Sequence, residues 1–96
     1  MKILTIEFER VPVDWKEIDP ALLKAEARHV FNLQQADLIR QIHFTADTKR
    51  AVIEWEADSL EKVKTEISSF PLVQAGLIDF EYYPLAPYSG FNTLFG

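Results

Sequence analysis

The sequence predicts an α+β fold in which four strands and two helices follow in the order strand, helix, strand, strand, helix, strand. Three observations carry this prediction. Apolar and polar residues alternate in four short segments, two longer segments have apolar residues at helical spacing, and both of these begin with a helix-capping signal. Because a chain of 96 residues is too short for two self-sufficient cores, we expect residues 1–96 to form a single domain.

The first strand is expected over residues 1–10, where the side chains alternate. We expect the apolar side to face the core and the polar side to face away from it: Leu4, Ile6 and Phe8 inward, and Thr5, Glu7 and Glu9 outward. Pro12 then interrupts the strand pattern, because proline cannot donate a hydrogen bond to a neighbouring strand. A connecting loop is therefore expected to lead into the first helix.

The first helix is expected to begin at Asp19 and Pro20, since aspartate suits the capping position and proline suits the first turn. It continues to about residue 36. The residues that recur on one of its faces are Leu23, Ala27, Val30, Phe31 and Gln34, and those on the opposite face are Lys24, Arg28, Asn32 and Gln35.

Two strands, at 38–45 and 50–56, are expected to form a hairpin around the polar turn 46–49. The second helix begins with a capping signal at Ser59, carries Leu60, Val63 and Ile67 inward, and ends before Pro71. The last strand is expected over 77–83, with a core face formed by Ile78, Phe80 and Tyr82.

This order of elements predicts a ferredoxin-like sandwich, in which both helices cover one face of a four-stranded antiparallel sheet. The other face is expected to be mixed, carrying Thr5, Glu7, Gln41, His43, Val52, Glu54, Asp79, Glu81 and Tyr83. Residues 85–96 form an apolar C-terminal arm whose large side chains are costly to leave in water. Together, the mixed face and the arm favour association with a second copy of the chain.

Composition excludes several classes of function. A net charge of −5 and a pI near 4.9 argue against nucleic acid as a partner. The RNA-recognition fold has the same element order, but here the third strand carries Glu54 and Glu56 where bases would have to stack. The chain has no cysteine, and no apolar run approaches the roughly 20 residues needed to cross a bilayer. We therefore expect a soluble cytoplasmic protein without a membrane partner.

The segment from Phe70-Pro71-Leu72 through Gly76-Leu77-Ile78-Asp79-Phe80-Glu81 to Pro84-Leu85-Ala86-Pro87-Tyr88 resembles the C-terminal signature of the muconolactone isomerase-like proteins. Glu26, Leu33 and Gln34 fall at spacings that match the family's first helix. The resemblance implies a dimeric α+β barrel, in which the sheets of two protomers pack together. It also implies proton transfer on an unsaturated lactone, without metal or organic cofactor.

The sequence departs from the true isomerase in two places. The stretch 35–38 lacks the Gly-containing, Trp- and His-bearing segment of that enzyme, and the turn at 47–49 is longer. Both differences fall near the place where the resemblance puts the substrate. Because of these differences, the resemblance does not identify which lactone would be the substrate.

Three residues are candidates for catalysis. Glu26, which matches the family's helix, is the candidate proton carrier, and its alternative role is a surface ion pair. His43 is a candidate acid or base, or else an ordinary histidine on a sheet face. Arg40 can steady an enolate or hold a substrate carboxylate, or else pair with a glutamate on a neighbouring strand.

Two further features have a structural and a functional interpretation. His29 follows Glu26 by three residues, but a single Glu-x-x-His pair supplies too few ligands for a metal. Four aromatic residues can form either plain core or the wall of an apolar pocket: Phe31, Phe44, Trp55 and Phe80. No motif for a bound cofactor or metal is present.

Three functions follow from these observations. The first is a cofactor-free isomerase that moves a proton on a small unsaturated lactone or carbonyl compound. The second is a non-catalytic dimeric module that binds a small ligand or a protein, and the third is a cofactor-free oxygenase on the same fold.

Overall fold

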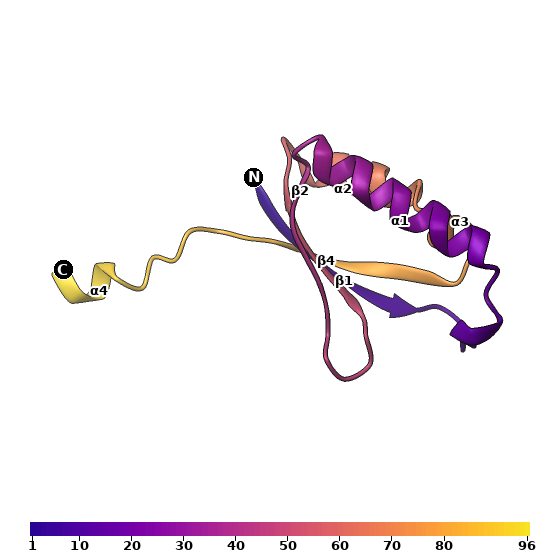
Figure 1. Cartoon of the computed structure of the whole chain (residues 1–96). Helices are drawn as coiled ribbons and strands as arrows, with labels where there is room; N and C mark the ends of the chain where they lie inside the picture. The colour runs from indigo at the N-terminus through magenta and orange to yellow at the C-terminus, as the bar shows by residue number, and fades with distance from the viewer.

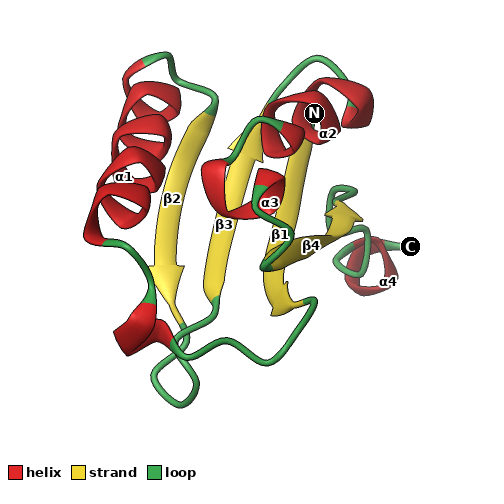
Figure 2. Cartoon of the chain, turned by 90° about the vertical axis from the view of Figure 1, so that its right-hand side faces the viewer, coloured by secondary structure: helices red, strands yellow, loops and turns green.

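The computed structural model describes residues 1–96 and contains the six predicted elements in the predicted order. They are β1 (Lys2–Glu9), α1 (Pro20–Gln35), β2 (Ile39–Phe44), β3 (Ala51–Glu56), α2 (Leu60–Ser68) and β4 (Ile78–Pro84). The strands form one antiparallel sheet in the order β2-β3-β1-β4. Both long helices lie on one face of it (Figures 1 and 2). The predicted ferredoxin-like α+β fold is confirmed.

Both predicted helix starts are present with their caps. The Asp19 carboxylate accepts a hydrogen bond from the Ala21 amide at 2.9 Å, and the Ser59 hydroxyl accepts one from the Lys62 amide at 3.1 Å. Helix α1 ends at Gln35, and just beyond it Asp37, with a φ of 63°, lets the Leu38 amide turn back to the Leu33 carbonyl. These contacts define where both helices begin and where α1 ends.

The prediction for the two sides of β1 is wrong. Ile3, Thr5 and Glu7 are buried beneath the helices, whereas the alternate residues Leu4, Ile6 and Phe8 are half-buried on the opposite face. The polar side chains are stable inside because each has a hydrogen-bond partner. Thr5 accepts from the Trp55 indole at 2.9 Å, and Glu7 accepts from the Ala51 amide at 2.8 Å. The open face of the sheet is consequently more apolar than the sequence suggested.

Three short elements supplement the predicted ones: the 3₁₀ turn η1 (Trp15–Glu17) and the helices α3 (Pro71–Gln74) and α4 (Asn92–Phe95). Helix α3 lies in the stretch between the predicted end of the second helix and the predicted start of the last strand, where no helix was expected. Pro71 begins this helix because its fixed backbone angle suits a first helical turn. Gly76, with a φ of 76°, then reverses the chain into β4.

The hydrophobic core lies between the helices and the sheet. Its fully buried large side chains come from both layers: Ile3, Ile39, Ile53, Trp55, Val63, Ile67, Phe70 and Ile78. The predicted inward positions Val63, Ile67, Ile78 and Phe80 are buried, and Leu60 and Tyr82 pack against the core from its edge.

The C-terminal residues run away from the sheet and end in α4, as Figure 1 shows. The Leu85 amide still donates to the Lys2 carbonyl at 2.9 Å, but beyond it the large side chains are exposed. These are Tyr88, Phe91, Leu94 and Phe95, with 61–88% of their surface accessible. No helix combines the length and apolar character that a membrane span requires.

Candidate functional site

A cavity of about 870 Å³ lies between α1 and the helix-facing side of the sheet. Of its 20 lining residues, 13 are hydrophobic, and the polar groups are few. This size and composition are typical of small-molecule sites, which span roughly 300–1,000 Å³. The fold therefore leaves space for a small ligand between α1 and the sheet.

The rim of the cavity consists of apolar side chains that no other part of the chain covers. Trp15, from η1, donates its indole N–H to the Glu9 carboxylate at 2.8 Å and is 37% exposed. Leu23 and Phe31 come from α1, and Phe44 comes from the end of β2. We call these four side chains the rim. Their exposure shows that the space between α1 and the hairpin is open to solvent.

Glu26 lies on the face of α1 that borders the cavity, where Leu23, Ala27 and Val30 lie beside it. Its Oε1 atom accepts a hydrogen bond from the Leu72 amide of α3 at 3.0 Å. Burial raises the pKa of the Glu26 carboxyl, the bond from Leu72 and the nearby His29 act in the opposite direction, and the charge of Glu7 raises it further. The net effect is a carboxyl group that keeps its proton more readily than an exposed glutamate.

Glu7 is a second carboxyl group on the same cavity, and the sequence prediction missed it. Its pKa is raised chiefly by burial, against the bond from Ala51. Alternation within β1 alone gave no sign of this position, because Leu4, Ile6 and Phe8 are the more apolar set. The signal lies in strand pairing: Glu7 is opposite Phe80, a residue that the sequence placed on the core face.

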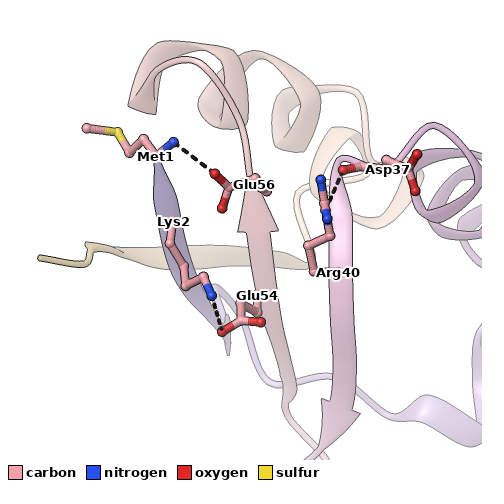
Figure 3. Close-up of polar contacts among 6 residues, drawn as sticks. All are labelled: Met1, Lys2, Asp37, Arg40, Glu54 and Glu56. Atoms are coloured by element: carbon pink, nitrogen blue, oxygen red, sulfur yellow. Dashed lines mark hydrogen bonds and ion pairs between the residues drawn. The ribbon is translucent and has the colours of Figure 1, made fainter. Parts of the chain in front are cut away.

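The predicted site residue Arg40 does not line the cavity. It lies at the irregular start of β2, where the register shifts between Ile39 and Gln41. Its Nε atom donates to the Asp37 carbonyl at 3.0 Å, so that the side chain closes the loop after α1 (Figure 3). Arg40 is therefore separate from the two glutamates. Its predicted alternative, an ion pair with a glutamate, is also absent.

His43 is exposed, and its pairing with Val52 places it on the sheet face that the helices leave open. It borders the cavity where β2 forms the edge of the sheet. Of the three predicted site residues, the structure thus places Glu26 and His43 on one cavity and Arg40 elsewhere.

His29 follows Glu26 by about one turn of α1 and does not line the cavity. Its ring contacts the edge of Phe70, with the centroids 5.0 Å apart, and its buried Nε2 atom has no hydrogen-bond partner. No group of three or more His, Cys, Asp or Glu side chains is arranged to hold a metal ion. The Glu-x-x-His spacing therefore has no further candidate ligand near it.

Two of the four aromatic residues for which the sequence allowed either a core or a pocket position lie in the core, and two lie in the rim. Trp55 and Phe80 are buried core residues, of which Phe80 also forms part of the cavity wall. Phe31 and Phe44, with 49% and 69% of their surface accessible, belong to the rim.

The structure is similar to that of muconolactone isomerase, with a TM-score of 0.72 and 20% sequence identity over 93% of this chain and 92% of that one. It is also similar to 5-chloro-2-hydroxyhydroquinone dehydrochlorinase from Burkholderia phenoliruptrix AC1100, in its complex with 2,5-dihydroxybenzoquinone. There the TM-score is 0.60 and the identity 16%, over 92% of this chain and 97% of that one. No family model and no curated protein matches the sequence. The predicted resemblance to muconolactone isomerase is thus confirmed in the fold.

Proposed function

We propose that the protein is an enzyme of the muconolactone isomerase type, which moves a proton on a small unsaturated lactone or related carbonyl compound. The observation that carries this proposal is the Glu26 carboxyl group in a large apolar cavity, where burial raises its pKa. A carboxylate whose pKa approaches the working pH is a better base than an exposed one.

In the proposed reaction, the Glu26 carboxylate takes a proton from the carbon next to the substrate carbonyl. The apolar wall favours a compact ring compound, and the proton is returned at another carbon to complete the shift of the double bond. This chemistry requires neither metal nor organic cofactor. Arg40 has no part in it because it is turned toward Asp37, and His43 stays a predicted acid or base at the edge of the cavity.

The two similar structures support the choice of a small ring compound. One is an isomerase named for a lactone, and the other was determined with 2,5-dihydroxybenzoquinone. A ligand of that size fits within a cavity of about 870 Å³.

The test is exchange of substrate hydrogen with deuterated water, followed by NMR on a panel of unsaturated lactones. We expect the Glu26→Gln variant to lose exchange and isomerisation by roughly 100-fold or more. Glutamine keeps an oxygen that can accept from the Leu72 amide, so the fold is retained. Glu61→Gln, at an exposed position on α2, is the matched control. Unchanged turnover in Glu26→Gln would rule out the proposed role of Glu26.

We further propose that the open sheet face joins two copies of the chain, as the resemblance implies. That face carries the half-buried Leu4, Ile6, Phe8 and Val52, an apolar group that is unusual on a surface open to water. The exposed arm 85–96 adds further apolar surface. Removing residues 87–96 is expected to weaken the assembly. An unchanged mass in solution would contradict a role for the arm.

A non-catalytic binding module is the second candidate function, and the exposed rim favours it. Such a protein would bind small apolar compounds in the same cavity but catalyse no hydrogen exchange. The exchange experiment separates the two functions.

A further inference from the structure

Glu7 and Glu26 approach the cavity from opposite layers of the fold. Glu7 belongs to β1, a central strand of the sheet, and Glu26 belongs to α1, which covers that sheet (Figure 2). The Oε1 atom of Glu7 accepts a hydrogen bond from the Ala51 amide, and the Oε1 atom of Glu26 accepts one from the Leu72 amide. The second oxygen of each carboxyl makes no hydrogen bond within the protein. Both carboxyls are thus held in place with one oxygen unengaged.

The surroundings of the two carboxyls differ in charge. His29 lies near Glu26 and favours its ionised form. Glu7 has Glu9 and Arg50 near it, which act in opposite directions, and only 7% of the residue is exposed. The negative charge of Glu7 also raises the pKa of the Glu26 carboxyl, so that an ionised Glu7 disfavours ionisation of Glu26.

We propose that Glu7 is a second catalytic residue, an inference that rests on the proposed function. Glu7 and Glu26 act as a carboxyl pair in which ionised Glu26 removes a proton and protonated Glu7 delivers one. Such a division between two carboxyl groups requires that their environments differ. Here His29 lies near Glu26, whereas Glu7 is enclosed in the sheet with 7% of the residue exposed.

The step balances without any further reactant. The Glu26 carboxylate takes the proton from the carbon next to the carbonyl, and the electrons of that C–H bond form a new carbon–carbon double bond. The electrons of the original double bond form a C–H bond with the proton that Glu7 releases. Glu26 ends protonated and Glu7 ionised, and exchange with solvent in the open cavity restores the starting state.

The charged side chains around the cavity also indicate which substrate charge the cavity favours. Three acidic residues line the cavity, Glu7, Glu26 and Asp47, against one cationic side chain, Lys49. Lys49 lies in the hairpin turn, and Arg40 does not reach the cavity. The lining therefore carries more acidic than cationic side chains, which disfavours a substrate carboxylate. We infer that the cavity takes an uncharged ring carbonyl compound.

Kinetics on Glu7→Gln and Glu26→Gln, with an uncharged β,γ-unsaturated butenolide as the probe, test the assignment of roles. Both glutamines keep an oxygen for the backbone amide, and Glu61→Gln is again the control. Glu26→Gln should lose both exchange and isomerisation. Glu7→Gln should still exchange the hydrogen next to the carbonyl but should isomerise about 100-fold more slowly. Isomerisation at the full rate in Glu7→Gln would overturn the proposal and leave Glu7 a structural residue.

The same butenolide bearing a carboxymethyl group tests the substrate class. We expect at least a tenfold lower kcat/KM for this anionic compound, and a preference for it would overturn the inference about charge.

A measurement without substrate separates failure of the pair from failure of the proposed function. In protein labelled with ¹³C at the glutamate carboxyls, the Glu26 signal should titrate at a lower pH in Glu7→Gln than in the unaltered protein. An unshifted titration would show that the carboxyls do not interact, and this result would overturn the pair even if the enzyme is active. A shifted titration in a protein inactive on every lactone would overturn the proposed function and the catalytic role of Glu7 with it, while showing that the carboxyls interact.

Discussion

The space between helices and sheet is filled at one end and left open at the other. Beneath α2 and α3, the side chains of Trp55, Val63, Ile67 and Phe70 are at most 1% exposed. The Phe70 ring lies 6.2 Å from that of Trp55 and 5.6 Å from that of Phe80. Beneath α1, the same kinds of side chain surround a cavity of about 870 Å³. We refer to the packed half and the open half.

The difference between the two halves shows that a segment rich in apolar residues does not always form a close-packed core. In helix α1 only Leu33 is buried, with 7% of its surface exposed, whereas the shorter α2 buries Val63 and Ile67 almost completely. The packed half is therefore expected to carry the stability of the fold. The open half leaves its aromatic and aliphatic side chains free to contact a ligand.

The largest effect is expected from removing a large side chain in the packed half. Trp55→Ala should lower the free energy of unfolding by about 3–5 kcal/mol, because it leaves a cavity and removes the hydrogen bond to Thr5. Phe31→Ala, in the rim, should cost less than about 1 kcal/mol because half of that side chain is already exposed. Denaturant unfolding of both variants checks the contrast. Equal losses would mean that the two halves are packed alike.

A smaller effect is expected from pH. Burial raises the pKa values of Glu7 and Glu26 above their ordinary value of 4.5, to which they return on unfolding. Above this value the folded protein still holds protons that the unfolded chain has lost, so its stability falls as the pH rises toward the raised pKa values. Below it this contribution is fully present.

The variant with glutamine at both positions provides the check. Its free energy of unfolding should vary less between about pH 4.5 and pH 7 than that of the unaltered protein, as measured by urea titration at both pH values. If the two proteins show the same pH dependence, the carboxyls are not buried as the structure has them.

Local signals were sufficient to predict the fold. Asp19 and Ser59 marked both helix starts, and the alternation at Ile78 and Phe80 gave the correct side of β4. For β1 the same reasoning failed, because the buried side carries the polar residues Thr5 and Glu7, which are stable inside only through their hydrogen bonds. Only the pairing of Thr5 with Ile53, and the indole that bonds to it, determines which side faces the helices.

The candidate site could be predicted only in part. Glu26 was predicted because its position on α1 matched a family pattern, and it lines the cavity. Glu7 was missed because a buried glutamate requires a partner from another strand, the Ala51 amide, which residue spacing does not show. Arg40 lies away from the cavity because its side chain, at the irregular start of β2, bonds to the Asp37 carbonyl, a contact that the sequence does not show.

The most direct test of the open half is to fill it. Ala27 is exposed on the cavity face of α1, whereas Ala57 is 7% exposed and packs in the core. Ala57→Trp should destabilise the fold by about 3 kcal/mol, because the site has no space for an indole. Ala27→Trp should change the unfolding free energy by less than about 1 kcal/mol yet abolish hydrogen exchange on the lactone panel. Full activity in Ala27→Trp, or destabilisation equal to that of Ala57→Trp, would contradict the presence of a functional cavity beneath α1.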